Sequence, residues 1–330
     1  MPKPRNSILS LDITPYYHCT SKCVRGSFLC GVDKTTGCDY THRRKWLRDR
    51  LLFLSSTFSI KIAAFSIMEN HFHVVLFVNK NAADEWSTKE VIERWHRIFK
   101  GNNLSQKYLS GESIKKQEEE TLSLDVDTWR KNLCSVSWFM RCTKEPLARM
   151  ANKEDQCKGR FWDGRFHCQA LLDKKSLLAC MTYVDLNPFR ARMCQFPEED
   201  KYTSLKIRLE SSKHSESYLR CSLDFITGDK KSPENPETPR IPLSIAEYLH
   251  VVDTTARVYR SDKRGFLNTN EASIFRRLGF NMEQWISAAT LFNKYFYTFV
   301  GKRSSLLAAI DATGRSTVWG IRNCESLLGT

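Results

Sequence analysis

Two histidines separated by one residue are the first candidates for chemistry in this chain. His71 and His73 lie between two apolar segments, 60–68 and 74–78, that are rich in β-branched and aromatic residues. Such residues favour a strand, in which side chains alternate between faces, so both histidines are expected to point the same way. Two imidazoles on one face can bind one metal ion. The alternative interpretation is a pair of exposed or hydrogen-bonded strand histidines.

A tyrosine and an asparagine form a second candidate pair, more than a hundred residues further along the chain. Apolar residues recur at helical spacing before this pair, and Asp173 resembles an N-terminal helix cap. Tyr183 and Asn187 are four residues apart and share a face of the predicted helix, whereas Asp185 points away. Because Pro188 has no N–H, the helix is expected to end or kink there. The pattern presents a phenol and an amide oxygen together, although a half-buried tyrosine followed by a helix-ending asparagine also fits it.

The elements that must position these side chains follow a split α+β pattern. Strands are predicted over 15–24, 58–68, 71–78 and 160–172, and helices over 41–55, 88–100 and 127–151. Their order predicts a ferredoxin-like fold with an antiparallel sheet. The polar segment 107–125 is expected to be either a solvated helix or a mobile insertion.

The chain is long enough for two domains. It has 330 residues, and its 41% apolar content can bury a sizeable core. We expect the α+β domain to occupy residues 1–205, followed by a polar, proline-containing linker at 206–240. Residues 241–330 are predicted to form a mainly helical C-terminal domain. This domain is either a small DNA-binding module or a bundle that braces the first domain.

The composition is that of a basic protein. Lys and Arg number 51 against 37 Asp and Glu, and the net charge of +14 fits a nucleic-acid partner. Near the candidate site, guanidinium groups are interleaved with aromatic side chains, an arrangement that suits unpaired bases. The predicted DNA contacts are Arg160, Trp162, Arg165 and Arg190. Phe161 and Phe166 are alternatively core strand residues, and at least one of them is expected to be.

The composition does not favour a membrane or secreted protein. No run of about eighteen apolar residues occurs, and residues 1–5 are not followed by an apolar signal region. A cytoplasmic, nucleoid-associated protein is therefore expected. Twelve cysteines are present without a Cys-x-x-Cys pair, and in this compartment they are expected as buried thiols. Structural zinc held by the irregularly spaced Cys19, Cys23, Cys30 and Cys38 is an alternative.

Three segments together resemble a known family. They are 68–76 (MENHFHVVL), 159–166 (GRFWDGRF) and 183–192 (YVDLNPFRAR). In order and spacing they resemble the REP-associated tyrosine transposases, relatives of the single-tyrosine insertion-sequence transposases within the HUH superfamily of single-strand DNA nucleases. The resemblance extends over roughly residues 10–195. A fainter likeness continues over 241–265, where some long members have a similar extension.

The resemblance implies a metal-dependent nuclease that acts on a single-stranded, imperfect DNA hairpin. It implies that His71, His73 and the Asn187 amide oxygen bind Mg²⁺ or Mn²⁺. It also implies that Tyr183 attacks the scissile phosphate to give a 5′-phosphotyrosine and a free 3′-hydroxyl. Asp163 is expected either to orient a ligand or the site water, or to be an exposed turn carboxylate. Members of the family work as monomers or homodimers, without a nucleotide cofactor.

Two other interpretations stay open. One is a domesticated, non-catalytic hairpin DNA-binding protein that keeps the basic face. The other is a zinc hydrolase that uses the two histidines with a carboxylate such as Asp163. The sequence favours the nuclease because the tyrosine and the histidine pair are both present. No further ligand at a fixed spacing supports the zinc hydrolase.

Overall fold

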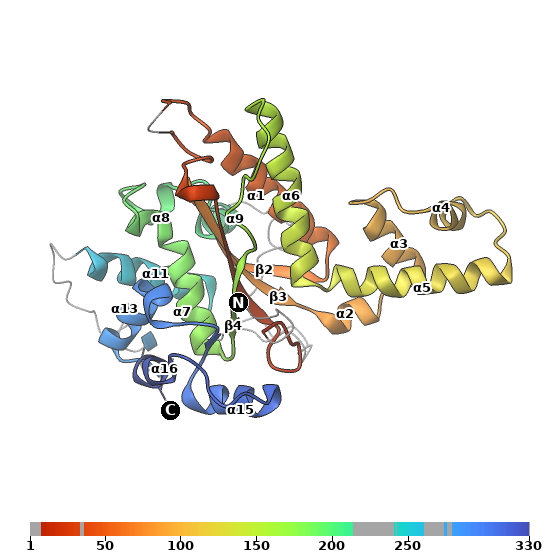
Figure 1. Cartoon of the computed structure of the whole chain (residues 1–330). Coiled ribbons are helices and arrows are strands. Elements are labelled where there is room, and N and C mark those ends of the chain that lie inside the picture. Colours follow the sequence, from red (N-terminus) through yellow and green to blue (C-terminus); the bar gives the residue numbers. More distant parts are fainter. Residues whose placement is uncertain are drawn as a thin grey trace.

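The protein is an α+β structure built on a five-stranded sheet (Figure 1). The computed structural model describes residues 8–33, 36–213, 241, 243–260, 274–275 and 279–329. The strands are β1 (Tyr16–Lys22), β2 (Ile60–Ile67), β3 (His71–Val78), β4 (His167–Leu171) and β5 (Phe299–Val300). Their order in the sheet is β2-β3-β1-β4-β5. The first four strands are antiparallel to their neighbours, and β5 is parallel to β4.

The first four strands have the order of a ferredoxin-like fold, which confirms the predicted fold class. The fourth strand is shorter than predicted, because it begins at His167 rather than at residue 160. The residues before it form a turn in which Gly164 has a φ of 86°, a conformation that glycine adopts readily. An isolated bridge between Cys23 and Trp162 joins this turn to the chain just beyond β1.

Helices cover both faces of the sheet. α1 (His42–Thr57) and α6 (Val136–Glu154) pack on one face, and α7 (Lys174–Asp185) packs on the other (Figure 1). β2 and β3 are almost entirely buried as a result. Burial on both faces explains why their sequences are nearly continuous apolar runs rather than alternating patterns.

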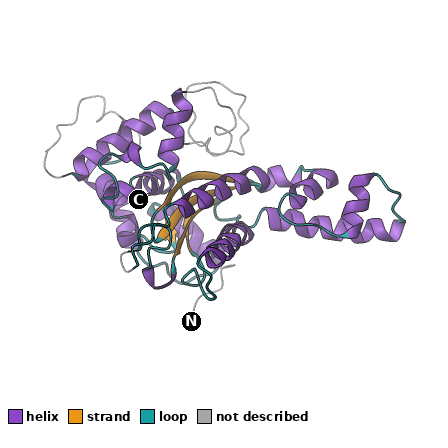
Figure 2. Cartoon of the chain, turned by 90° about the horizontal axis from the view of Figure 1, so that it is seen from above, coloured by secondary structure: helices purple, strands orange, loops and turns teal. Residues whose placement is uncertain are grey.

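The helices that follow β3 form an arm. They are α2 (Lys80–Asp84), α3 (Thr88–His96), α4 (Asn103–Ser110) and α5 (Lys116–Leu133). α3, α4 and the start of α5 extend away from the body of the molecule (Figures 1 and 2). The polar segment 107–125 is therefore largely helical. The single helix predicted over 127–151 is instead two helices, because the backbone is extended at Ser135, whose hydroxyl caps the start of α6.

The C-terminal region is mainly helical, as predicted, but it also adds β5 to the sheet beside β4. The remaining helices are α8 (Asn187–Arg190), α9 (Ser204–Lys213), α11 (Ile245–Tyr259), α13 (Met282–Thr290), α14 (Phe292–Tyr295), α15 (Arg303–Thr313) and α16 (Ile321–Leu328), with the 3₁₀ helices η2 (Val24–Gly26) and η3 (Pro197–Glu199). The start of the predicted linker, 206–240, belongs to α9, and the rest of it lies outside the described residues. Of the helices described, none has the length and apolar character needed to cross a membrane.

A buried carboxylate ties α7 to two later helices. Asp185, the last residue of α7, is fully buried. Its Oδ2 accepts a hydrogen bond from the Tyr248 hydroxyl of α11 (2.6 Å) and pairs with Arg208 of α9 (3.1 Å). Its Oδ1 accepts from the Leu205 N–H (3.0 Å) and from the Ser204 hydroxyl. Both carboxylate oxygens of Asp185 are therefore hydrogen-bonded within the protein, although burial removes them from water.

We expect Asp185→Asn to lower the free energy of unfolding by about 3–5 kcal/mol, because Arg208 would keep its buried charge beside a neutral group. Urea unfolding followed by circular dichroism measures the change. Asp253→Asn is the matched control, since Asp253 pairs with Arg257 at 3.0 Å on an exposed part of α11. Such a pair contributes less than about 1 kcal/mol. Equal losses in both variants would contradict the argument from burial.

Candidate active site

The two predicted metal ligands lie on β3, on the face of the sheet that α7 covers. His73 is buried, His71 is partly buried, and their ring centroids are 5.0 Å apart. The strand register pairs His73 with Thr20 and His71 with Lys22 of β1. The two-residue period of the strand thus brings both imidazoles to one face, as the sequence predicts.

A chain of hydrogen bonds fixes which nitrogen of His73 carries the proton. Gln169 Nε2 donates to the Phe296 carbonyl (2.9 Å), so its Oε1 accepts from His18 Nδ1–H (2.6 Å). His18 Nε2 then accepts from His73 Nδ1–H (2.9 Å), which also contacts the Thr20 hydroxyl (3.0 Å). The lone pair of His73 is consequently on Nε2.

His71 is oriented by its neighbour in the same way. Asn70 Nδ2 donates to the Gly26 carbonyl (3.3 Å), and Asn70 Oδ1 accepts from His71 Nδ1–H (2.6 Å), which leaves the His71 lone pair on Nε2. Burial lowers the pKa of His71 to about 4 and the pKa of His73 well below its usual value. Both imidazoles are therefore neutral at pH 7, the form in which histidine binds a metal.

The predicted nucleophile, Tyr183, lies edge-on to His73, with 5.7 Å between the ring centroids. Its hydroxyl oxygen accepts a hydrogen bond from Asn293 Nδ2 (3.0 Å), and Phe292 packs against its ring. The residue is 7% exposed. Burial raises the pKa of the phenol, and the Arg190 guanidinium, 4.6 Å from the ring centroid, acts in the opposite direction.

Asn187 follows Tyr183 by about one helical turn. α7 ends at Asp185 and α8 begins at Asn187, with Pro188 in its first turn, so the break lies where the proline predicts it. Asn187 is buried, and its Nδ2 has no hydrogen-bond partner in the described part of the chain. The same holds for Nε and Nη1 of Arg190. Buried polar groups of this kind are uncommon, and here they lie within two helical turns of the phenol, where a ligand could satisfy them.

The donor set is chemically suited to a divalent cation. Nε2 of His71 and Nε2 of His73 carry lone pairs, and Nδ2 of the Asn187 amide has no hydrogen-bond partner in the described chain. The described residues contain no group of three or more His, Cys, Asp or Glu side chains that could hold a metal, and the Asn187 amide oxygen stays the predicted third ligand. Among the described residues, neither Asp163 nor another carboxylate joins His71 and His73 in such a group, so the zinc hydrolase interpretation lacks its carboxylate ligand there.

The turn that carries the predicted DNA contacts lies beside the end of β1. The Asp163 N–H donates to the carbonyl of Lys22 (2.9 Å), and the register pairs Lys22 with His71. The turn is thereby held at the edge of the candidate site. Arg160, Asp163 and Arg165 are all exposed on it. Their roles as DNA contacts, and as an orienting carboxylate, stay predictions.

Trp162 has a different environment from the one predicted for it. It is 8% exposed, its Nε1 donates to the Lys144 carbonyl (2.9 Å), and its ring packs against Phe72 at 5.5 Å. Phe161 and Phe166 are buried as well, as expected of at least one of them, but both precede β4, so neither is the strand residue that was expected. Trp162 thus anchors the turn to the sheet, and its role as a DNA contact stays a prediction.

Three residues of the site are not among those that the sequence singled out. His18 and Gln169 orient His73, and Asn293 holds the phenol. The position of His18 in the strand predicted over 15–24 was a signal for it, because a strand residue can face the histidines of a neighbouring strand. His18 faces Gln169 because β1 pairs with β4, which only the fold shows. No local sequence pattern marks Asn293, which is 110 residues from Tyr183 in the chain.

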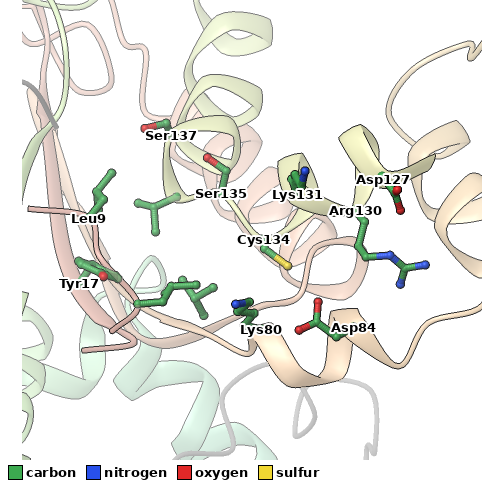
Figure 3. Close-up of a pocket in the computed structure, with 13 residues that line it drawn as sticks. Leu9, Tyr17, Lys80, Asp84, Asp127, Arg130, Lys131, Cys134, Ser135 and Ser137 are labelled. Atoms are coloured by element: carbon green, nitrogen blue, oxygen red, sulfur yellow. The ribbon is translucent and has the colours of Figure 1, made fainter. Parts of the chain in front are cut away.

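A cavity of about 580 Å³ lies near the start of β1 and the end of β3, away from His71 and His73 (Figure 3). Tyr17 borders it near the start of β1, and Lys80 and Asp84 of α2 lie across from Lys131 and Cys134 near the end of α5. Burial raises the pKa of the Cys134 thiol to about 11, so this thiol is protonated at neutral pH. None of the candidate site residues lines this cavity, which is therefore separate from the chemistry described above.

Comparisons with known proteins do not assign the chain to a family. No protein-family model matches it, and no curated protein is similar to it in sequence. A solved structure of a REP-associated tyrosine transposase bound to a REP hairpin is similar over 71% of this chain and 96% of that chain. The sequence identity is 11% and the TM-score is 0.38. These values are too low to establish that the two proteins share a fold or a function.

We expect the free energy of unfolding to fall as the pH drops from about 6.5 toward 4. Burial lowers the pKa of His18 and of His71 to about 4 in the folded protein, whereas both have ordinary values in the unfolded chain. Between the two values the unfolded state binds more protons, so acid favours it, by roughly 2 kcal/mol per histidine at pH 5. Urea unfolding at a series of pH values measures this slope. His18→Gln should reduce it, and an unchanged slope in that variant would contradict the assignment.

Proposed function

We propose that this protein is a metal-dependent endonuclease and strand transferase that acts on single-stranded, hairpin-forming DNA through a 5′-phosphotyrosine intermediate. The observation that carries the proposal is the position of Tyr183, edge-on to His73 at 5.7 Å and 4.6 Å from the Arg190 guanidinium. A phenol, neutral imidazoles and a guanidinium with unpaired nitrogens are groups that phosphoryl transfer from DNA uses.

Tyr183 is the nucleophile in this proposal. Its phenolic oxygen exchanges the hydrogen bond from Asn293 for contact with the scissile phosphate. A bond forms from this oxygen to phosphorus as the phenol loses its proton to solvent, the bond from phosphorus to the 3′ oxygen breaks, and the 3′ oxygen takes up a proton from solvent. The phosphotyrosine ester keeps the energy of the broken bond for strand transfer to a second 3′-hydroxyl. Arg190 stabilises the negative charge that develops on the phenolate and phosphate oxygens.

His71 and His73 hold the divalent ion through their Nε2 atoms, and Asn187 supplies an amide oxygen. Mg²⁺ or Mn²⁺, when bound there, polarises the phosphate oxygens. The imidazole ligands favour Mn²⁺ of the two. Support comes from the hydrogen bonds that direct both Nδ1–H groups away from the proposed ion.

The proposed DNA partner is supported by charge. The chain carries a net charge of +14, and Arg160 and Arg165 are exposed on the turn beside the site, where each can contact a phosphate. Asp163 on the same turn orients a ligand or the site water. A REP-like hairpin is the proposed substrate because of the sequence resemblance. The protein acts as a monomer or a homodimer, in the cytoplasm with the nucleoid.

A second candidate function is hairpin binding without cleavage. The observation that favours it is that the phenol is covered by the C-terminal region. Asn293 donates a hydrogen bond to the hydroxyl of Tyr183, and Phe292 packs on its ring. A domesticated DNA-binding protein would keep the basic surface while this cover stays closed. The two candidates differ in whether the tyrosine ever becomes attached to DNA.

We expect the wild-type protein to form a covalent adduct with 3′-labelled hairpin DNA in the presence of Mn²⁺, and Tyr183→Phe to form none. A denaturing gel resolves the adduct from free DNA. Tyr108→Phe on the exposed part of α4 is the matched control and should react as the wild type does. Binding of hairpin DNA without an adduct in the wild type would favour the second candidate, and cleavage that survives Tyr183→Phe would point to a water nucleophile.

We expect Gln169→Leu to weaken Mn²⁺ binding by about 10–100-fold, because His18 loses the acceptor that fixes its tautomer and, through it, that of His73. Titration calorimetry with MnCl₂ in a Tyr183→Phe background measures this affinity without turnover. Gln106→Leu, on the arm, is the control for loss of an amide. An unchanged affinity in Gln169→Leu, with binding abolished by His71→Ala, would contradict the role of the hydrogen-bond chain.

A further inference from the structure

Lys22, the last residue of β1, is a basic residue at the candidate site to which the proposed chemistry gives no role. The strand register pairs it with His71, and residues directly opposite each other in an antiparallel pair point to the same face of the sheet. Two residues back along β1, the Thr20 hydroxyl contacts Nδ1 of His73 at 3.0 Å on this same face. The Lys22 side chain therefore lies beside the proposed metal ligands.

The charge of Lys22 acts on the histidines around it. Burial, and after it the Lys22 ammonium, lower the pKa of His71 to about 4. The same two causes lower the pKa of His167, and Lys22 adds to the effect of burial on the pKa of His73. Lys22 is exposed, and its ammonium forms no ion pair or hydrogen bond with the residues that the structure describes.

An ammonium in this position calls for an anionic ligand. A positive charge beside the proposed cation site raises the energy of the bound ion, unless an anion lies between the two charges. No carboxylate of the described chain pairs with Lys22. A phosphate of the substrate, held by the ion, is an anion that Lys22 can reach at the same time.

The phenol and Lys22 lie toward opposite ends of this site. The Tyr183 ring packs edge-on against the rings of His18 and His73, with centroid distances of 6.3 and 5.7 Å. Lys22 lies four residues beyond His18 on β1, about 13 Å along the strand at the usual rise per residue. His71 is at the Lys22 end, since the register pairs the two. A phosphate held by the two ligands therefore has the phenol on one side and Lys22 on the other.

The proposed reaction requires groups on both sides of the phosphate. In an in-line displacement the attacking and leaving oxygens lie roughly on a line through phosphorus. When the Tyr183 oxygen bonds to phosphorus, the bond to the 3′ oxygen breaks, and its electron pair stays on that oxygen, opposite the phenol. Arg190, 4.6 Å from the phenol ring centroid, is on the attacking side. The leaving side needs a positive charge of its own.

We propose that the Lys22 ammonium contacts the 3′ oxygen of the scissile phosphate and stabilises the negative charge that develops as this oxygen leaves. The inference rests on the proposed function and assigns to a named residue the stabilisation of the leaving group. The 3′ oxygen then takes up a proton from solvent. In the reverse step, strand transfer, the same ammonium donates a hydrogen bond to the attacking 3′-hydroxyl, which loses its proton to solvent.

The test compares two 3′-labelled hairpin DNAs that differ in one atom, the oxygen or sulfur that bridges C3′ and phosphorus at the mapped cleavage position. A thiolate leaves readily without a cation beside it. We expect Lys22→Gln to slow single-turnover adduct formation with Mn²⁺ about 100-fold on the oxygen-bridged DNA and less than about fivefold on the sulfur-bridged DNA. Lys61→Gln is the matched control and should react as the wild type does, because Lys61 lies on β2 opposite Phe77, away from the site.

A second measurement does not depend on cleavage. In a Tyr183→Phe background, Lys22→Gln should tighten Mn²⁺ binding by about threefold to tenfold, because it removes a positive charge close to the ion. Titration calorimetry with MnCl₂ measures this affinity, and Lys61→Gln should leave it unchanged. An unchanged affinity in Lys22→Gln would contradict the position of the ammonium beside the ion.

The outcomes separate this inference from the proposed function. Equal slowing of Lys22→Gln on both DNAs, or wild-type rates on both, would overturn the leaving-group role while the wild-type adduct still supports the proposed function. A wild type that forms no adduct on either DNA would overturn both. Circular dichroism melting shows whether the variant is folded. If it is not, Lys22→Thr, which suits a strand, replaces it in the same comparison.

Discussion

The carboxylate of Asp185 is the interaction on which the arrangement of this protein depends. It ends the helix that carries Tyr183, and its partners come from α9 and α11, which lie later in the chain. A buried carboxylate has a large desolvation cost, and this cost is offset only when every partner is in place. The need to satisfy this carboxylate therefore fixes α7, which carries Tyr183, against α9 and α11. A solvent-exposed ion pair has a much smaller desolvation cost and would not fix the helices in this way.

The site that results is shared between the sheet and the C-terminal region. β1, β3 and β4 contribute His18, His73 and Gln169, and the chain from Gln169 ends at the carbonyl of Phe296. Asn293, three residues before it, holds the phenol. The C-terminal helices thus do more than brace the first unit, because they set the tautomer of one histidine and cover the tyrosine.

The charges at the site follow from burial. Burial keeps the histidines neutral and raises the pKa of the phenol, and the positive charges of Arg190 and Lys22 lie beside the site. One guanidinium, that of Arg190, consequently lies beside the phenol, where its positive charge favours the phenolate form.

The sequence by itself determined the features that depend on periodicity within one element. The two-residue period of β3 puts His71 and His73 on one face, the helical period puts Tyr183 and Asn187 together, and Pro188 ends the helix. The order of strands and helices was enough to predict the ferredoxin-like sheet, because few topologies are compatible with it. These are local or combinatorial constraints, and they can be derived without coordinates.

The tertiary structure alone decided which elements face one another and which side chains are covered. Periodicity places a residue on a face but does not name the element opposite, so His18, Gln169 and Asn293 entered the site through strand pairing and helix packing. For the same reason Trp162, which resembles a stacking residue in sequence, is buried against Phe72 instead. Burial is a property of the whole packed chain, as is the contact of Asp185 with Tyr248, which joins α7 to α11.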